Sequence, residues 1–126
     1  ALASMVCHGV FDRFPKLKVA AVEAGSAWLA PLLYRLGLAY KKLPKSFAQD
    51  PVKSLREHLW IMPFYEESAK ELGEILGIDH VLFGSDWPHP EGLANPLDYF
   101  SDISDLSAED QRKVMSDNLK NLIDAR

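Results

Sequence analysis

The apolar positions of this chain follow two alternating patterns, one typical of amphipathic helices and one typical of buried strands. Near the start they recur with helical spacing, at Leu2, Met5, Val6, Gly9 and Val10. This spacing predicts one helix that ends near Arg13, because the residue before Pro15 is pushed out of the α region. We therefore expect the chain to begin inside a helix whose apolar face is covered by other parts of a fold.

Three short apolar runs predict buried strands. They lie at residues 19–22, 59–62 and 81–83. None of them alternates apolar and polar residues, as expected of parallel strands that are buried on both faces. A run this short also fits a buried helix, so the prediction depends on the breaking residues that flank each run.

Helices are predicted between and after these strands. A leucine-rich stripe predicts one after residue 26, with Pro31 tolerated in its first turn. Residues 52–58 predict a short helix, and apolar positions from Tyr65 to Leu76 predict another that Gly77 ends. Three further short helices are expected with caps at Asn95, Ser107 and Asp117. This alternation of strands and helices indicates an α/β fold with a parallel sheet.

Ligands of parallel α/β folds bind beyond the carboxyl ends of the strands. Here those ends lead into three segments, at residues 23–26, 63–66 and 86–91. The last one is the richest, because Asp86 directly follows a strand and is rigidly aimed, as a metal ligand or proton acceptor must be. Trp87 offers a flat apolar wall, and His89 with Glu91 adds a second ionisable pair. The alternative is a solvated turn in which Asp86 caps a helical turn and His89 lies on the surface.

Glu23 follows the first predicted strand and precedes Gly25. An unpaired buried carboxylate is costly, so Glu23 either functions in the site or pairs with a basic group or a helix N-terminus. Other reactive side chains favour structural roles. His8, His58, His80 and Cys7 belong to this group, Cys7 as a small buried apolar residue.

Composition narrows the classes of function. The formal net charge is -4 and the two signs are interspersed, which disfavours a nucleic-acid partner. No apolar run approaches a membrane span, so no membrane association is expected. The single cysteine excludes an internal disulfide and fits a reducing compartment, and we expect a cytoplasmic location.

Three segments resemble a known family. They are GVFDRFPKLKV at residues 9–19, WIMPFYE at 60–66 and VLFGSDWPHP at 81–90. They are similar to parts of amidohydrolase-related proteins of the aminocarboxymuconate-semialdehyde decarboxylase type, the last segment to the final barrel strand. The resemblance covers nearly the whole chain. It implies the C-terminal part of a TIM-type (β/α)8 barrel, about its last three strand–helix units, as one domain over residues 1–126.

The resemblance also implies chemistry. The family binds one divalent metal, often zinc, through several histidines and an aspartate that ends the last strand, and that aspartate matches Asp86. Its members act on small molecules, either by hydrolysis with a metal-activated water or by nonoxidative decarboxylation. Asp86 would then be both metal ligand and proton acceptor, with Glu23, Trp87 and His89 binding substrate. Glu23 stands where the family often has a histidine, which leaves open an acid–base role, a different chemistry or a loss of activity.

The length of the chain sets a further expectation. Its 126 residues are about half of the ~250 that a complete barrel needs, and the family's histidine ligands have no counterpart here. We expect the chain alone to be inactive and to bind metal weakly, because one carboxylate does not hold a catalytic zinc. Three parallel strands also leave two open sheet edges, so we expect a homo-oligomer. A noncatalytic barrel fragment that self-associates is the remaining alternative.

Overall fold

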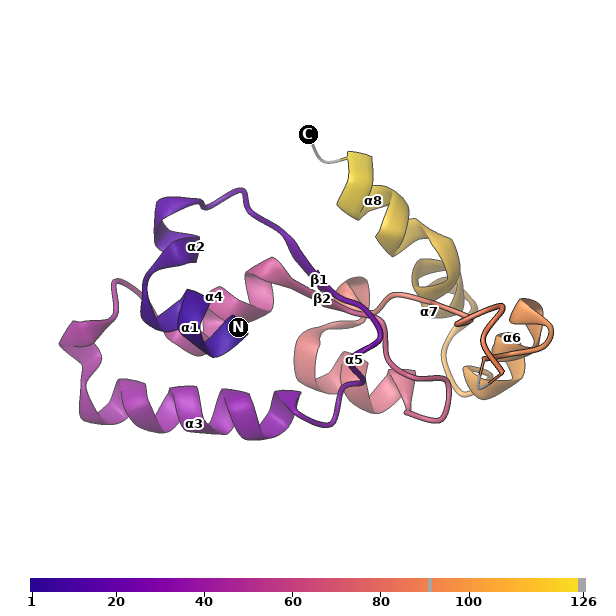
Figure 1. Cartoon of the computed structure of the whole chain (residues 1–126), viewed down its shortest axis with the longest axis horizontal. Helices are drawn as coiled ribbons and strands as arrows, with labels where there is room; N and C mark the ends of the chain where they lie inside the picture. The colour runs from indigo at the N-terminus through magenta and orange to yellow at the C-terminus, as the bar shows by residue number, and fades with distance from the viewer. Residues whose placement is uncertain (91, 125–126) are drawn as a thin grey trace. The chain divides into compact units, whose positions relative to one another are not determined.

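The computed structural model describes residues 1–90 and 92–124. Helices and short strands follow one another along the chain (Figure 1), in agreement with the α/β class expected from the sequence. The internal contacts divide the chain into two compact units. The first comprises Ala1–Val19 and Ala27–Leu59, and the second comprises Ala20–Ser26 and Trp60–Arg126. Each unit is described by itself below.

The elements have the following bounds. The helices of the first unit are α1 (Leu2–Cys7), α2 (Val10–Arg13), α3 (Leu29–Lys42), the 3-10 turn η1 (Pro44–Ser46) and α4 (Pro51–His58). Those of the second are α5 (Ala69–Leu76), η2 (Ile78–His80), η3 (Pro96–Asp98), α6 (Tyr99–Asp102), α7 (Ala108–Arg112), the π-helical turn η4 (Lys113–Asp117) and α8 (Asn118–Asp124). The strands are β1 (Val19–Ala21) and β2 (Leu59–Ile61).

The sheet is smaller than the sequence predicts. β1 and β2 pair with each other, and the amide of Met62 continues the pairing by donating to the Ala21 carbonyl at 3.0 Å. The predicted third strand is reduced to one parallel bridge, between Ile61 and Val81. Next to the bridge, the Leu82 amide donates to the Ile61 carbonyl at 2.8 Å, and the Phe83 amide donates to the Val114 carbonyl of a helical turn at 3.2 Å.

The first predicted helix is also corrected. Two helices replace it, because Gly9 adopts a left-handed conformation with φ of 65° between α1 and α2. Cys7 at the end of α1 is exposed, so the expectation of a buried cysteine was wrong. Helical spacing reports one face of a segment and does not reveal where a glycine interrupts the segment.

The helix ends confirm most of the expected capping. Pro31 lies in the first turn of α3, Gly77 follows α5 with φ of 105°, and the side chains of Asn95 and Ser107 accept amide hydrogen bonds at N-caps. Asp117 does not cap a helix, because η4 joins α7 and α8 without a break. The helix predicted from Tyr65 begins only at Ala69, where Ser68 is its cap.

Each unit has its own packed interior. In the first unit Phe11 is 1% exposed and stacks on the His58 ring, with centroids 4.5 Å apart. In the second unit the buried Asn118 side chain donates to the carbonyls of Ile78 and Val81, both at 2.8 Å. Two hydrogen bonds from one buried amide fix α8 to the end of the segment that carries the bridge.

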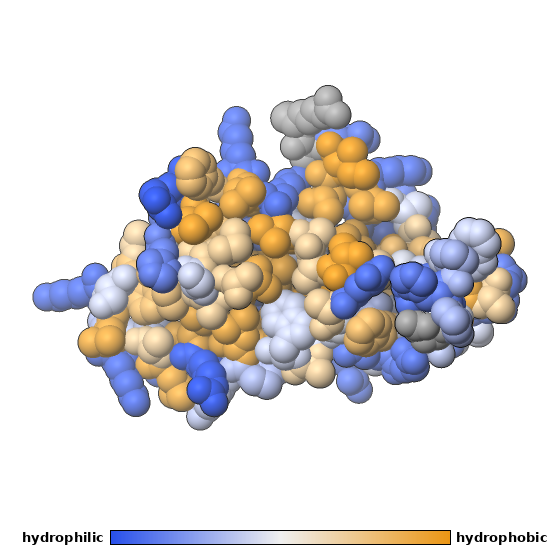
Figure 2. Space-filling model, in the orientation of Figure 1, coloured by the Kyte–Doolittle hydropathy of each residue, from blue (hydrophilic) through white to orange (hydrophobic). Residues whose placement is uncertain are grey.

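The surface carries some apolar side chains. Figure 2 shows apolar atoms at the surface around α8, where Leu119 and Ile123 are exposed. Among the described residues, no helix combines the length and the apolar character that a membrane span requires. The expected homo-oligomer stays a prediction.

Candidate active site

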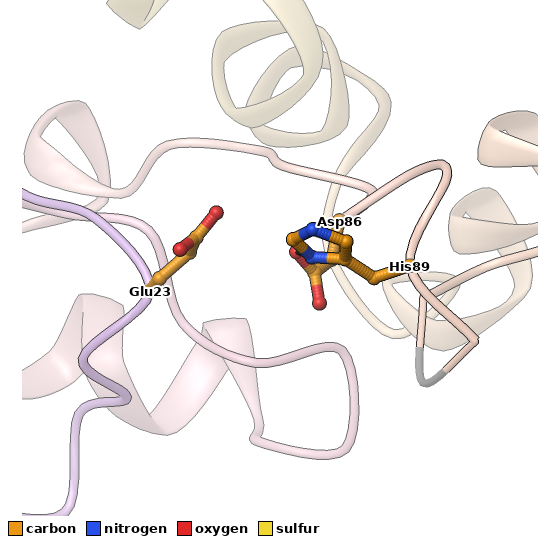
Figure 3. A group of neighbouring side chains, drawn as sticks. All are labelled: Glu23, Asp86 and His89. Atoms are coloured by element: carbon orange, nitrogen blue, oxygen red, sulfur yellow. Dashed lines mark hydrogen bonds and ion pairs between the residues drawn. The ribbon is translucent and has the colours of Figure 1, made fainter.

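Three side chains that the sequence analysis selected lie together in the second unit. One ligand atom each from Glu23, Asp86 and His89 falls within 4.8 Å of the others. Figure 3 shows that Glu23 comes from a different segment than Asp86 and His89, and that the three side chains face a common space. The strand order explains the convergence, because Glu23 follows β1 and Asp86 follows the segment that bridges to β2.

The backbone at both carboxylates has an uncommon conformation. Glu23 has φ of 53° and Asp86 has φ of 56°, in the left-handed region that residues with a Cβ rarely adopt. Such a conformation costs about 1–3 kcal/mol and persists only where the surroundings enforce it. The two strained residues within the described chain that are not glycine are thus the two carboxylates of the cluster.

Asp86 and His89 are joined by a hydrogen bond. His89 Nδ1 lies 2.9 Å from Oδ1 of Asp86, and the His89 amide donates to the Asp86 carbonyl at the same distance. Since a carboxylate only accepts, the hydrogen lies on Nδ1 when Asp86 is ionised. The Asp86 side chain is 23% exposed and that of His89 57%. The pair is therefore held by its local turn while staying accessible.

A cavity of about 460 Å³ opens at this cluster. Its lining consists of Glu23, Met62, Pro63, Phe64, Tyr65, Glu66, Gly84, Asp86 and His89. The lining combines apolar and aromatic side chains from residues 62–65 with three carboxylates and one imidazole. This combination of apolar wall and few polar groups is typical of small-molecule sites.

Tyr65 adds a hydrogen-bonding group to the apolar wall. The negative charge of Glu66 raises the pKa of the Tyr65 phenol above 10.0, with smaller contributions from burial, from a hydrogen bond to Glu66 and from the charge of Asp102. The phenol is therefore protonated at neutral pH, and its O–H donates to the Glu66 carboxylate.

The cavity includes residues that the sequence analysis did not select. Met62 and Gly84 face each other closely, since a Cβ at Gly84 would lie 1.8 Å from the Met62 sulfur. Glu66 lines the cavity, although the sequence predicts that it lies within a helix that starts at Tyr65. The rule on strand ends does select residues 63–66 as a segment, and the structure confirms that they lie outside a helix, since α5 begins only at Ala69.

The remaining candidates lie elsewhere. Trp87 does not line the cavity and is 66% exposed, so its role in substrate binding stays a prediction. Glu91 lies outside the described residues. The other three histidines are not in the cluster. The rings of His8 and His58 each hydrogen-bond to a carbonyl four residues earlier, and the His80 ring stacks on Trp60 with centroids 4.4 Å apart.

The donor set of the cluster suits a divalent metal. Two carboxylates and one imidazole nitrogen are the ligand types that zinc and manganese share. Ligand atoms within 4.8 Å of one another need only small side-chain movements to contact one ion. The residues present therefore fit a metal, and Asp86 is the least exposed of the three.

Solved structures and a curated protein are similar to this chain. An amidohydrolase from Mycobacterium avium subsp. paratuberculosis K-10 is 46% identical with a TM-score of 0.94, over 97% of this chain and 32% of that protein. The 2-amino-3-carboxymuconate-6-semialdehyde decarboxylase of Dictyostelium discoideum is 27% identical over 94% of this chain and 34% of its own length. This chain thus spans about a third of the length of both proteins.

Two decarboxylase structures share the fold at 23% identity. The first is 5-carboxyvanillate decarboxylase from Sphingomonas paucimobilis, with a TM-score of 0.77 over 95% of this chain and 37% of that chain. The second is dihydroxybenzoic acid decarboxylase from Polaromonas sp. JS666, with a TM-score of 0.75 over 98% of this chain and 38% of that chain. The second of these structures contains manganese and the inhibitor 2-nitroresorcinol. The model of the Amidohydrolase family matches residues 1–119, and this chain is therefore a member of that family.

Proposed function

We propose that this chain forms part of the active site of a metal-dependent hydrolase of the amidohydrolase family. The convergence of Glu23, Asp86 and His89 at one cavity carries this proposal. Asp86 would hold the metal, with Glu23 and His89 near enough to contribute further ligand atoms. The three residues come from two segments that are more than 60 positions apart in the sequence, so their meeting is a property of the fold.

The chemistry divides between the metal and the side chains. A bound divalent metal supplies a Lewis acid that polarises substrate and lowers the pKa of a water. Asp86 accepts a proton during the reaction, and the Nδ1–H of His89 fixes the carboxylate that does so. Glu23 binds the substrate or moves a second proton, because its carboxylate faces the same space. The apolar wall with Tyr65 orients the organic part of the substrate.

A second candidate is nonoxidative decarboxylation of a small unsaturated or aromatic acid. The names of three relatives favour it, since all three are decarboxylases. The aromatic wall of Phe64 and Tyr65 suits a planar substrate. Both candidates use the same metal site, and only the fate of the substrate separates them.

The architecture is part of the proposal. We propose that residues 1–126 correspond to the C-terminal part of a (β/α)8 barrel, as one partial-barrel domain, with further metal ligands supplied by the rest of such a barrel. The coverage of 32–38% of the solved structures supports this assignment. The 126-residue chain alone is then expected to lack activity.

Self-association, which would cover the sheet edges, is tested by light scattering over a wide concentration range.

Metal binding and product analysis test the function. We would titrate the protein as its gene encodes it with Mn²⁺ and Zn²⁺ in a calorimeter, beside its Asp86→Asn variant. Binding of one equivalent that the variant loses supports the proposal, and equal binding by both proteins overturns the role of Asp86. Incubation with carboxylated phenols and with amides or lactones then separates the candidates, because only a decarboxylase releases carbon dioxide.

A further inference from the structure

The Glu67 carboxylate, next to the cavity, accepts hydrogen bonds from two separate backbone segments. Glu67 accepts the Ser26 amide through Oε1 at 2.9 Å and the Phe64 amide through Oε2 at 3.0 Å. Ser26 belongs to the segment after β1 and Phe64 to the segment after β2. One side chain therefore joins the two segments that leave the carboxyl ends of neighbouring strands.

The contact between the two segments is close on both sides of this carboxylate. Gly25 has φ of 59°, and a Cβ at this position would lie 2.9 Å from the Phe64 ring and 3.3 Å from Oε1 of Glu67. Only a glycine lets the backbone approach the ring and the carboxylate this closely. On the other side, the Glu67 amide donates to the Phe64 carbonyl at 3.0 Å, which closes the turn that carries the side chain.

Both joined segments carry residues of the cavity. Glu23 lies three positions before Ser26, in the strained left-handed conformation with φ of 53°. Phe64 and its two following neighbours, Tyr65 and Glu66, line the cavity directly. Hydrogen bonds from amides to an ionised carboxylate are about twice as strong as neutral ones, so Glu67 is well suited to hold a strained segment in place.

We propose that Glu67 is a positioning residue that holds the Glu23 segment against the wall formed by Phe64, Tyr65 and Glu66. It acts on the site through Glu23, and it has no contact with substrate or metal in this proposal. The inference rests on the proposed metal site for its consequence, while the hydrogen bonds that carry it are independent of any metal. Without Glu67, the left-handed conformation of Glu23 relaxes and its carboxylate leaves the cluster.

Amide exchange tests the connection itself. In the protein as its gene encodes it, Glu67→Gln leaves one acceptor oxygen for two amides. We expect the exchange of the Ser26 and Phe64 segments, measured by mass spectrometry, to accelerate by at least about fivefold, since a net hydrogen bond is worth roughly 1 kcal/mol. The matched control is Glu74→Gln, an exposed position on α5, and it is expected to leave both segments unchanged. Unchanged exchange in both segments of the Glu67 variant overturns the proposal.

A double-mutant cycle tests the action through Glu23. We expect Glu67→Gln to weaken Mn²⁺ binding by about tenfold, as loss of an outer partner does at metal sites. In a Glu23→Gln background the same change is expected to weaken binding by less than about twofold, because the two residues act in one chain of contacts. A purely structural role gives the same loss in both backgrounds and overturns the proposal.

Two further outcomes are separable. If Glu67→Gln does not fold, Glu67→Asp keeps the charge but is one methylene shorter, and we expect it to release at least one of the two segments to exchange. If the unmodified protein binds no Mn²⁺, the proposed function fails. Amide exchange alone then tests whether Glu67 joins the two segments. Faster exchange of both segments in the Glu67 variant supports the proposal, and unchanged exchange overturns it.

Discussion

His89 Nδ1 donates a hydrogen bond to Oδ1 of Asp86 at 2.9 Å, and the two residues are also joined through the backbone of one turn. Among the described residues, Oδ2 of Asp86 makes no hydrogen bond. The imidazole therefore fixes one carboxylate oxygen, and the other is available to an ion in the proposed site. Carboxylates that bind metals commonly accept such a hydrogen bond from an outer partner.

Loss of this hydrogen bond should weaken metal binding without abolishing it. We expect His89→Ala to lower Mn²⁺ affinity by about 10–100-fold, as removal of an outer partner does, and Asp86→Asn to lower it further. Calorimetric titration measures both, with His8→Ala as the control because His8 is exposed and its side chain bonds to Ser4 of its own helix. Greater loss in the His89 variant than in the Asp86 variant would make His89 the principal ligand.

Proton transfer by Glu23, as proposed above, predicts that its loss lowers kcat and that added metal does not restore it. We expect Glu23→Gln to lower kcat by about 10²–10⁴-fold at saturating metal, the usual contribution of a proton-transferring group. Glu66→Gln is the matched comparison, since Glu66 lines the same cavity but is not one of the three clustered donors. A similar kcat for both variants would remove Glu23 from proton transfer.

The close approach of Gly84 to Met62 predicts a paired effect. A Cβ at position 84 would lie 1.8 Å from the Met62 sulfur, so Gly84→Ala must displace that side chain into the cavity or strain the backbone. We expect a loss of about 1–3 kcal/mol in unfolding free energy, the usual effect of overpacking. Met62→Ala should restore at least half of it in the double variant. Urea unfolding measures the series, and a loss that Met62→Ala leaves unchanged contradicts the steric cause.

The sequence was sufficient to find the clustered residues but not their connection. Glu23 and Asp86 follow apolar runs, and the rule that ligands gather at strand ends selects them without any contact information. Glu67 was not selected, because its proposed positioning role depends on two amides that only the fold brings within reach. Cys7 was misplaced for a similar reason, since helical spacing defines a face but does not show what covers it.

The buried His58 predicts a loss of stability that is independent of the site. Its Nδ1 lies 2.7 Å from the Ser54 carbonyl oxygen and its Nε2 3.2 Å from that of Pro15, while its ring stacks on Phe11. His58→Phe keeps the stacking ring but removes both polar contacts. We expect it to lower the unfolding free energy by about 1–3 kcal/mol, because the buried ring then makes no hydrogen bond to either carbonyl. Urea unfolding checks this value, with His8→Phe expected to stay within about 0.5 kcal/mol of the original protein.

The buried Tyr99 predicts how stability falls at high pH. Burial raises the pKa of its phenol to about 12, with smaller contributions from the charges of Asp102 and Glu67. In the unfolded chain the phenol ionises near 10, so above that pH the unfolded state releases a proton that the folded state keeps. The stabilisation is complete below pH 10 and is lost as the pH rises toward 12, by up to about 3 kcal/mol at 1.4 kcal/mol per pKa unit. Tyr99→Phe removes this group, so its unfolding free energy should fall less than that of the original protein between pH 9 and pH 11.5. Urea unfolding at the two pH values measures the difference, and parallel losses in both proteins would show that the phenol ionises at the same pH in the folded and unfolded states.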